Sequence, residues 1–370
     1  MYKLFLRIEK CLEGFKVWVK YNTLRRKNRI RYSTKNKKVA RLPGDFTRKY
    51  KANCKKHKIK YDLNRVKLYI AFNNTHDLNY ITEEFYKYYI EPYLNLKRYS
   101  STIFQNKAFI DLLPKVFNDI PDVFIFNYLK KINGVFYDTD LINQKSPETI
   151  ISNIKDEKII YKKILDTGSS KGVQMFFKNK NGDFINNQGT NLKDYIYHEN
   201  NFILQKVIRQ HSILSKFNET SLNTARIITY RSVKDEKIHI LHQYIRIGDK
   251  GELFDTTKNA SRIRILKNGT LHSKRLFRDL SLQENEINVD FPEYEEVIQI
   301  AKNIASHFVY HRIIGFDFAV DSSSDVKIIE FNTGLTPEPT NILTGSFFGE
   351  FTDEVMDYVN KKRMEGKICG

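Results

Sequence analysis

Residues 314–334 read IGFDFAVDSSSDVKIIEFNTG, and they carry two strand-like runs joined by a polar, serine-rich turn. β-Branched and aromatic residues dominate both runs, which predicts an antiparallel hairpin in the interior of a sheet. If Ser322–Asp325 form a four-residue loop, Asp317 lies opposite Glu330, and Asn332 extends the same face by the two-residue period of a strand. The opposite face is then wholly apolar and consists of Phe316, Phe318, Val320, Ile329 and Phe331.

Two carboxylates that face each other across a hairpin destabilise it unless a cation compensates their repulsion. Asp, Glu and Asn all supply hard oxygen ligands, which suit Mg²⁺ rather than zinc. The pattern therefore favours a metal site at Asp317, Glu330 and Asn332. A solvated face that tolerates the repulsion in water is the alternative, and a three-residue loop would move Glu330 to the other face.

Bulk composition limits the class of protein. The chain has 370 residues, of which 41% are hydrophobic, so it is long enough for two or three domains and is not of the disordered class. No apolar run approaches the roughly 20 residues of a membrane-spanning helix, and no signal-peptide pattern opens the chain. The cysteines, Cys11, Cys54 and Cys369, form no CxxC pair. Neither a disulfide framework nor a zinc site is indicated, and a cytoplasmic location is expected.

Positive charge is concentrated at the N-terminus. The net charge is +19, and residues 1–60 hold 21 Lys and Arg against three acidic residues. Together with Trp18 and an apolar stripe, this charge predicts peripheral contact of residues 1–40 with an anionic membrane. Packing of the stripe on the globular part is the alternative, and nucleic acid is not expected, because binding it needs no apolar stripe. The stripe has helical spacing over residues 1–22 and comprises Leu4, Phe5, Ile8, Leu12, Phe15 and Val19.

Hydrophobic periodicity organises the rest of the chain. The predicted elements are strands over 158–165, 172–178 and 201–208, hairpins over 224–247 and 261–277, and helices over 293–309 and 347–362. Antiparallel hairpins combined with helices predict an α+β fold rather than a doubly wound parallel sheet. The expected parts are a basic, partly helical segment (1–60), a mostly helical region (61–145), a first α+β lobe (146–210) and a second α+β lobe with the metal site (211–370).

Residues 314–334 resemble the metal signature of the ATP-grasp enzymes, in which an Asp on one strand is followed by E-x-N on the next. Upstream, YKKILDTGSSKGVQMF (161–176) resembles their lysine-bearing strand and glycine-containing phosphate loop. Within that superfamily, NFILQKVIRQHSIL (201–214) and SLNTARIITY (221–230) are similar to the sugar-transfer associated ATP-grasp family. The resemblance spans residues 100–345 and implies two α+β lobes that grip ATP.

The resemblance also implies roles for individual residues. Lys163, with Lys162 as its neighbour, matches the strand lysine that contacts the nucleotide, and a surface lysine on an edge strand is the alternative. Backbone N–H groups of the loop would approach the phosphates at Gly168, Ser169, Ser170 and Gly172. Backbone groups of the hinge between the lobes would read adenine at Gln205, Lys206, Val207 and Ile208. The chain departs from the family in having Ile164 where Pro is frequent and Lys206 where Glu is common.

Two arginines lie on paired predicted strands that lead towards the metal hairpin. The resemblance implies that Arg226 and Arg246 contact phosphate or acyl phosphate. The planar guanidinium suits that role because it holds phosphate or carboxylate bidentately. Asn259 and Arg262 in the next hairpin are further candidates, with an exposed strand residue as the alternative for Arg262.

The resemblance implies an ATP-dependent carboxylate–amine ligase that uses ATP and Mg²⁺ and forms an acyl phosphate. Its expected substrates belong to surface (capsular or O-antigen) polysaccharide assembly at the inner face of the membrane: a sugar acid or glycan carboxylate, and an amine or amino acid. Two alternatives remain. An ATP-grasp sugar kinase would need no amine, and a non-enzymatic protein that binds a polyanion or a membrane would not need Asp317 or Glu330.

Overall fold

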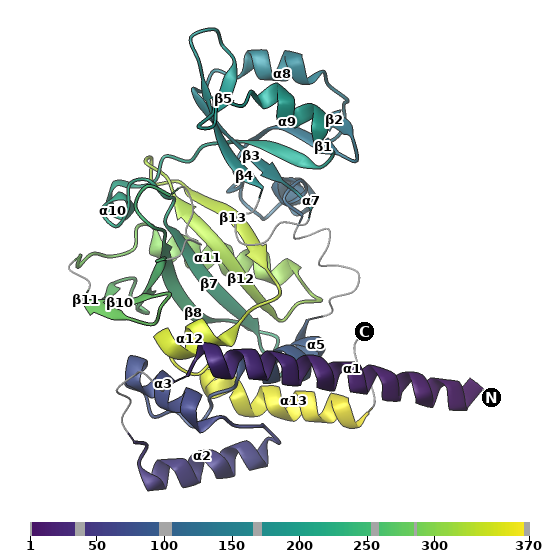
Figure 1. Ribbon diagram of the computed structural model, residues 1–370, viewed down its shortest axis with the longest axis vertical. Coiled ribbons are helices and arrows are strands. Elements are labelled where there is room, and N and C mark those ends of the chain that lie inside the picture. Colours follow the sequence, from purple (N-terminus) through teal and green to yellow (C-terminus); the bar gives the residue numbers. More distant parts are fainter. Residues whose placement is uncertain are drawn as a thin grey trace.

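A computed structural model describes residues 2–33, 41–95, 106–165, 172–252, 259–284 and 287–365, with the backbone alone for residues 2–10. Two antiparallel sheets follow each other along the long axis of the molecule, and a layer of helices lies at one end (Figure 1). Helices and antiparallel strands are segregated in this arrangement, so the fold is α+β, as predicted.

The smaller sheet has six strands in the order β2-β1-β6-β3-β4-β5. The helices α8 (Pro147–Asn153) and α9 (Leu192–His198) cover it (Figure 1). Ile159 and Tyr161 are buried in its core, and because side chains alternate along a strand, Ile160 and Lys162 lie on the opposite face. The strands are β1 (Asn127–Ile132), β2 (Val135–Tyr137), β3 (Lys158–Lys163), β4 (Val173–Lys178), β5 (Phe184–Asn186) and β6 (Phe202–Lys206).

The larger sheet has seven strands in the order β11-β10-β9-β8-β7-β12-β13. The amphipathic helix α11 (Tyr294–His307) packs on one face, where it buries Val297, Ala301 and Ile304. The other face meets the helical layer at one end and lines a cleft at the other. The strands are β7 (Thr224–Arg231), β8 (Ile238–Ile247), β9 (Ser261–Ile265), β10 (Leu271–Phe277), β11 (Leu282–Glu284), β12 (Ile313–Val320) and β13 (Val326–Asn332).

The helical layer joins the N-terminal residues to the C-terminal helices through one hydrophobic cluster. Its helices are α1 (Tyr2–Arg31), α2 (Gly44–Lys56), α3 (Leu63–Asn73), α4 (Glu83–Phe85), the π-helical turn η1 (Tyr86–Ile90), α5 (Glu91–Leu94), α12 (Pro337–Leu343), the 3₁₀ turn η3 (Gly349–Phe351) and α13 (Thr352–Met364). The short helices η2 (Ile110–Leu112), α7 (Leu113–Val116) and α10 (Ser212–Ser215) lie in the connections. The predicted hairpins β7–β8 and β9–β10 and the helices α11 and α13 are confirmed.

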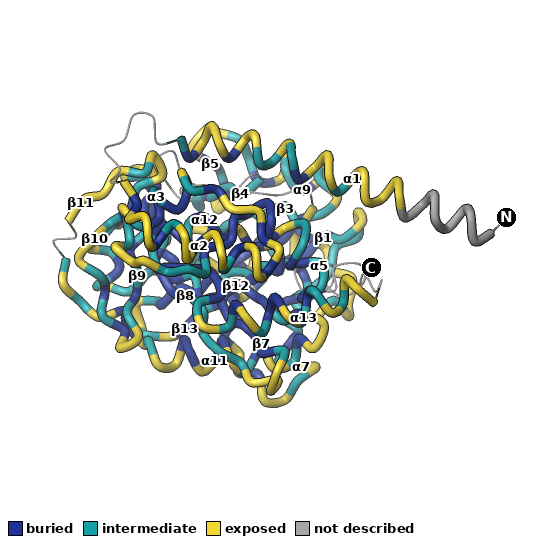
Figure 2. The backbone as a smooth tube through the Cα atoms, turned by 90° about the horizontal axis from the view of Figure 1, so that it is seen from below, coloured by how far each residue is buried: buried dark blue, intermediate teal, exposed yellow. Residues whose placement is uncertain are grey.

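The first helix is longer than predicted. It continues from the predicted 1–22 stretch to Arg31, because Lys and Arg are good helix formers and its last turns are anchored in the protein. Tyr21 and Tyr32 are buried, and Asn28 donates a hydrogen bond of 3.1 Å to Glu83. Further towards the N-terminus, the described residues of α1 are exposed apart from the half-buried Val17 (Figure 2).

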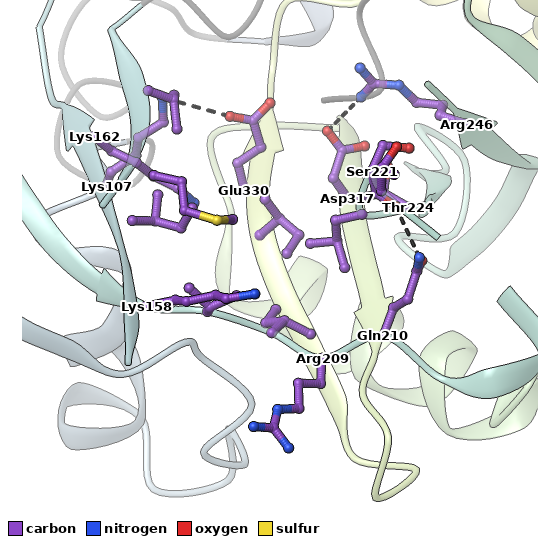
Figure 3. Close-up of a pocket in the computed structure, with 18 of the residues that line it drawn as sticks. Lys107, Lys158, Lys162, Arg209, Gln210, Ser221, Thr224, Arg246, Asp317 and Glu330 are labelled. Atoms are coloured by element: carbon purple, nitrogen blue, oxygen red, sulfur yellow. Dashed lines mark hydrogen bonds and ion pairs between the residues drawn. The ribbon is translucent and has the colours of Figure 1, made fainter. Parts of the chain in front are cut away.

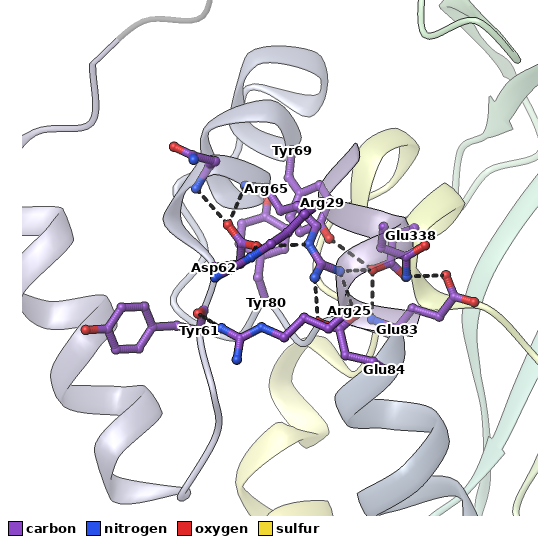
Figure 4. Close-up of polar contacts among 12 residues, drawn as sticks. Arg25, Arg29, Tyr61, Asp62, Arg65, Tyr69, Tyr80, Glu83, Glu84 and Glu338 are labelled. Atoms are coloured by element: carbon purple, nitrogen blue, oxygen red, sulfur yellow. Dashed lines mark hydrogen bonds and ion pairs between the residues drawn. The ribbon is translucent and has the colours of Figure 1, made fainter. Parts of the chain in front are cut away.

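A buried ion cluster ties the helical layer to the segment that leaves β13 (Figure 4). Arg65 donates to Glu84 over 2.5 and 2.8 Å and to Glu338 in α12 over 2.7 Å. Asp62 caps α3 by accepting hydrogen bonds from the backbone of Arg65 and its neighbour. Burial and the nearby Glu83 carboxylate raise the pKa of Glu338 to about 8. The cluster fixes α12 a few residues after the predicted metal strand.

Candidate active site

A cleft of about 1120 Å³ lies between the two sheets (Figure 3). The smaller sheet contributes β3 and β4, the larger sheet contributes β7, β8, β12 and β13, and residues 207–210 join the two sides. The apolar part of the cleft suits a flat aromatic base, and the charged groups can orient the rest of a ligand. Its apolar lining consists of Ile160, Val173, Met175, Phe177, Val207, Ile208, Leu222 and Ile329.

Asp317 is the centre of the charged part of the cleft. It lies opposite Glu330 on β13 and Arg226 on β7, so the predicted Asp317–Glu330 pairing is found. Arg226 donates to both Asp317 oxygens, through Nη2 over 2.7 Å, and Arg246 donates through Nη1 over 3.0 Å. Burial alone would raise the pKa of Asp317, but the two guanidiniums outweigh it and hold the pKa below its usual value. Asp317 is therefore ionised, and both arginines are fixed by it.

A glycine makes room for this ion pair. Gly315 lies two residues before Asp317 on the same face of β12. A Cβ atom at this position would come within 2.7 Å of Leu335 Cδ2 and 3.3 Å of Arg226 Cδ. A larger residue would therefore push the Leu335 side chain aside and crowd that of Arg226.

Glu330 and Asn332 complete the predicted ligand set. The Glu330 side chain is 35% exposed, lies 4.0 Å from the Lys107 ammonium, and accepts a 3.4 Å hydrogen bond from the Asn332 amide. No group of three or more His, Cys, Asp or Glu side chains that could hold a metal occurs in the described ranges. The set is thus two carboxylates, one of them engaged by arginines, and one amide. Such a set fits Mg²⁺ that arrives with nucleotide phosphates, because that ion is commonly held by one or two carboxylates plus phosphate oxygens.

The hairpin reaches this pairing by a different register from the one predicted. A β-bulge places Phe318, not Ala319, opposite Ile328, and Ile329 is the additional residue. Ile329 was predicted on the core face, but it lines the cleft. The turn pairs Val320 with Val326, one residue out of the predicted register. The additional residue in the bulge restores the predicted register, so Asp317 still pairs with Glu330.

The strand lysine differs from the prediction by one residue. Lys162 lines the cleft, whereas Lys163 lies on the other face of β3 and forms an ion pair with Glu199. The structure thus places Lys162, and not the predicted Lys163, at the cleft, because Tyr161 is buried in the core and side chains alternate along β3. Burial, together with the neighbouring Lys107 charge, lowers the pKa of Lys162 to about 8.

A chain of buried polar groups orients Lys162. Lys162 Nζ donates to the Gln205 amide oxygen over 2.5 Å, and Gln205 donates to Asn127 over 3.0 Å. Asn127 in turn donates to Asp111 over 2.7 Å, and Lys130 donates to the other oxygen of Asp111 over 2.7 Å. Gln205 was predicted to read adenine through its backbone, but its side chain is the part directed at the site, as the partner of Lys162.

The rest of the predicted hinge divides between the cleft and the surface. Val207 and Ile208 line the cleft, and their contact with adenine stays a prediction. Lys206 does not line it. Its side chain is exposed, and its backbone N–H already donates to the Phe126 carbonyl over 2.9 Å, so an adenine contact by that amide is not available.

The predicted phosphate loop is described only at its end. Gly168, Ser169 and Ser170 lie outside the described residues. Gly172 has φ +74° and accepts a 2.9 Å hydrogen bond from the Lys163 amide. A Cβ atom at this position would come within 2.8 Å of the Lys163 side chain, so glycine is required for this turn.

Several cleft residues were not predicted. Lys107 and Lys158 place two further cations at the cleft, and Figure 3 shows Lys107 pointing towards Glu330. Lys107 precedes a short helical connection and has no local motif, so no signal in its own stretch could have identified it. Asn259, a weaker candidate, is exposed and donates to Asp249 outside the cleft.

The two lobes around this cleft define an ATP-grasp protein, and the comparison with protein families agrees. The model of the sugar-transfer associated ATP-grasp family matches residues 85–276, just over half of the chain. The chain belongs to that family. A search of curated proteins found no match.

Solved structures show distant similarity. D-alanyl-alanine synthetase A from Vibrio cholerae is 14% identical, with a TM-score of 0.42 over 70% of this chain and 66% of that one. VanG D-Ala:D-Ser ligase from Enterococcus faecalis is 13% identical, with a TM-score of 0.41 over 70% and 63%. N5-carboxyaminoimidazole synthetase from Staphylococcus aureus, complexed with ADP, is 9% identical, with a TM-score of 0.38 over 62% and 45%. This chain covers less than two thirds of each structure, and the family assignment rests on the family model alone.

Proposed function

We propose that the protein is an ATP-dependent carboxylate–amine ligase that binds Mg²⁺-ATP in the cleft. The main support for this proposal is that cationic side chains and oxygen-donor side chains line the same cavity. Lys107 and Lys162 supply cations, and Glu330 and Asn332 supply hard oxygen donors. None of the described residues that line the cleft is His or Cys. Such a site favours catalysis by positioning and electrostatics rather than by a protein nucleophile.

In this proposal each group has a role in holding the reactants. The apolar part of the cleft holds the base, Lys162 donates to the phosphates, and Glu330 with Asn332 holds Mg²⁺. When bound, that ion would neutralise phosphate charge during transfer. Arg226 and Arg246, already oriented by Asp317, would bind the substrate carboxylate beside the γ-phosphate.

The proposed reaction has two steps. A carboxylate oxygen attacks the γ-phosphorus, the bond to the β-phosphate oxygen breaks, and ADP leaves with that electron pair. An amine attacks the acyl carbon, loses a proton, and displaces inorganic phosphate from it. The product is an amide, and the chain's arginines offset the negative charge that develops on the acyl phosphate oxygens.

We infer that the carboxylate belongs to a sugar acid or glycan and that the amide is made during surface polysaccharide assembly. The family's association with sugar transfer supports this substrate class. ATP-dependent phosphate release is expected only when both a sugar acid and an amine or amino acid are present. The measurement is a panel of such pairs with the full chain, with each partner omitted in turn. Formation of ADP and sugar phosphate with a neutral sugar and no amine, without release of inorganic phosphate, would identify a kinase instead.

The exposed part of α1 supports a peripheral membrane contact. Leu12, Phe15, Trp18 and Val19 are 55, 61, 53 and 41% exposed, although they are large and apolar. Phe15 and Trp18 stack at 5.9 Å between ring centroids, so the apolar groups are contiguous. The other stripe members, Leu4, Phe5 and Ile8, lie among residues whose side chains are not described. In the described part of the chain, no helix has the length and apolarity to span a bilayer.

The membrane contact predicts salt-sensitive sedimentation of the full chain with anionic vesicles. Substituting Phe15 and Trp18 with Ser should reduce the bound fraction at least about tenfold, because two aromatic anchors are lost. Deleting residues 1–40 is a poorer test, since it would remove the buried Tyr21 and Tyr32. The matched control is Ile142→Ser, which removes an apolar side chain that is 77% exposed elsewhere. Equal sedimentation of the double variant and the wild type would refute the contact.

A further inference from the structure

The face of the larger sheet that carries Asp317 continues as a row of arginines. Arg246 on β8 lies opposite Arg262 on β9, and Tyr244 lies opposite Arg226 on one side and Arg264 on the other. Directly opposite residues share a face, with Cβ atoms about 5 Å apart. Four guanidinium groups therefore occupy one continuous surface that begins at the proposed site of phosphoryl transfer.

The arginines differ in their counter-ions. Arg226 and Arg246 share the Asp317 carboxylate. Arg262 and Arg264 are half-buried, and neither forms an ion pair with a carboxylate within the ranges that the structure describes. Burial lowers the pKa of both groups, and for Arg262 the adjacent Arg246 and Arg226 add to that effect. A half-buried cation without a counter-ion is unfavourable, and an anionic ligand would relieve that cost.

A basic opening lies at the edge of this row. A second cleft of about 500 Å³ is lined by Lys27, Ile30, Arg31 and Arg278. Tyr32, the next residue after Arg31, is close enough to Arg262 for the two side chains to influence each other's pKa. The Arg278 amide donates to the carbonyl of Ala260 over 2.9 Å, at the start of β9. Cationic side chains thus extend from the reaction centre to the end of α1.

We propose that Arg262 and Arg264, with Lys27, Arg31 and Arg278 at the opening, form a second anion site that binds a phosphate or diphosphate ester on the substrate. The inference rests on the proposed function and adds a substrate class to it: a sugar acid joined to a phosphate-bearing carrier. The substrate carboxylate is already accounted for by Arg226 and Arg246. Several further guanidiniums match a group with more than one charge, and their planar forks suit phosphate oxygens.

The spacing fits such a substrate. Strands in a sheet lie about 4.8 Å apart and rise about 3.4 Å per residue, so the backbone of Arg264, directly across β8, is about 10 Å from that of Arg226, and that of Arg262 is about 12 Å from it. A sugar ring with its anomeric linkage spans a distance of this order. A sugar acid could therefore place its carboxylate at Arg226 while its anomeric phosphate reaches Arg262. Both a nucleoside diphosphate and a polyprenyl diphosphate carry the required diphosphate ester.

The test measures diphosphate binding by calorimetry on the full chain, with Mg²⁺ and β,γ-methylene-ATP saturating the first cleft. The probes are inorganic pyrophosphate, uridine diphosphate and geranyl diphosphate. The Arg262→Gln/Arg264→Gln double variant should lose at least about tenfold in pyrophosphate affinity, as expected when charge-assisted hydrogen bonds are removed. Arg48→Gln is the control, because Arg48 is exposed on α2 and paired only with Asp45 in the described contacts. Tighter binding of the uridine or the geranyl compound identifies a nucleotide or a lipid carrier, respectively.

Equal pyrophosphate affinity of the double variant and the wild type, or no binding by the wild type, overturns the anion site. An unchanged affinity of the double variant for the ATP analogue shows that this variant is folded. Failure of the wild type to bind the ATP analogue would count against the proposed function instead. The comparison of pyrophosphate affinity between the double variant and the wild type tests the anion site independently of that result.

Discussion

Glu330→Gln should reduce ATP turnover by about 10²-fold or more, the scale seen when a group that stabilises transition-state charge is removed. Glutamine keeps the shape of the side chain but replaces the carboxylate by an amide, so the Mg²⁺ that accompanies ATP would lose its carboxylate ligand on β13. The fold should be unaffected, because Glu330 is 35% exposed and its ion pair with Lys107 is long, at 4.0 Å. Phosphate release and thermal unfolding of the variant measure the two effects separately.

The control for this experiment is Glu284→Gln. Glu284 lies on β11, at the far edge of the same sheet, and is exposed. It should retain wild-type turnover. Full activity of Glu330→Gln under saturating Mg²⁺-ATP would contradict the metal assignment and with it the two-lobed catalytic site.

Lys162→Ala should weaken ATP binding by about tenfold or more, whereas Lys163→Ala should stay close to the wild type. A hydrogen bond to a charged group typically contributes about 1.5–3 kcal/mol, which corresponds to that loss. Lys162 lines the cleft and is held by Gln205, while Lys163 is 43% exposed and paired with Glu199. The adjacent lysines are therefore matched controls for each other.

Calorimetric titration of ATP into both variants compares the two positions directly. A larger loss for Lys163→Ala would mean that the opposite face of β3 meets the nucleotide. Equal small losses would mean that neither lysine contacts the phosphates, and Lys107 or Lys158 would then be the cations to substitute next.

The metal hairpin was predictable because its pattern is local. Asp317 and Glu330 lie on neighbouring runs of alternating residues, so one assumed turn is enough to pair them. The bulge at Ile329 was not predictable, because it compensates for the true length of the turn and is specified by the pairing of Val320 with Val326. Side-chain alternation therefore placed Glu330 correctly but failed beyond the bulge, where Ile329 lines the cleft and Ile328 pairs with Phe318 rather than with Ala319.

The lysine strand shows where local patterns are insufficient. Ile159, Ile160 and Tyr161 are all apolar, so the sequence does not say which of them is buried. Only pairing with β6, a strand about 40 residues away in the chain, buries Tyr161 and turns Lys162 to the cleft. Lys107 and the Gln205–Asn127–Asp111 chain depend on contacts between segments far apart in sequence, which no spacing rule encodes.

An isotope experiment shows whether the protein transfers the γ-phosphate of ATP to a substrate carboxylate. A sugar acid that supports phosphate release would be labelled with ¹⁸O in its carboxylate and incubated with ATP, Mg²⁺, the amine and the full chain. Attack of that carboxylate on ATP places one labelled oxygen in each released phosphate, which mass spectrometry detects. We expect one ¹⁸O in each released phosphate, and phosphate released without label would rule out attack by the carboxylate.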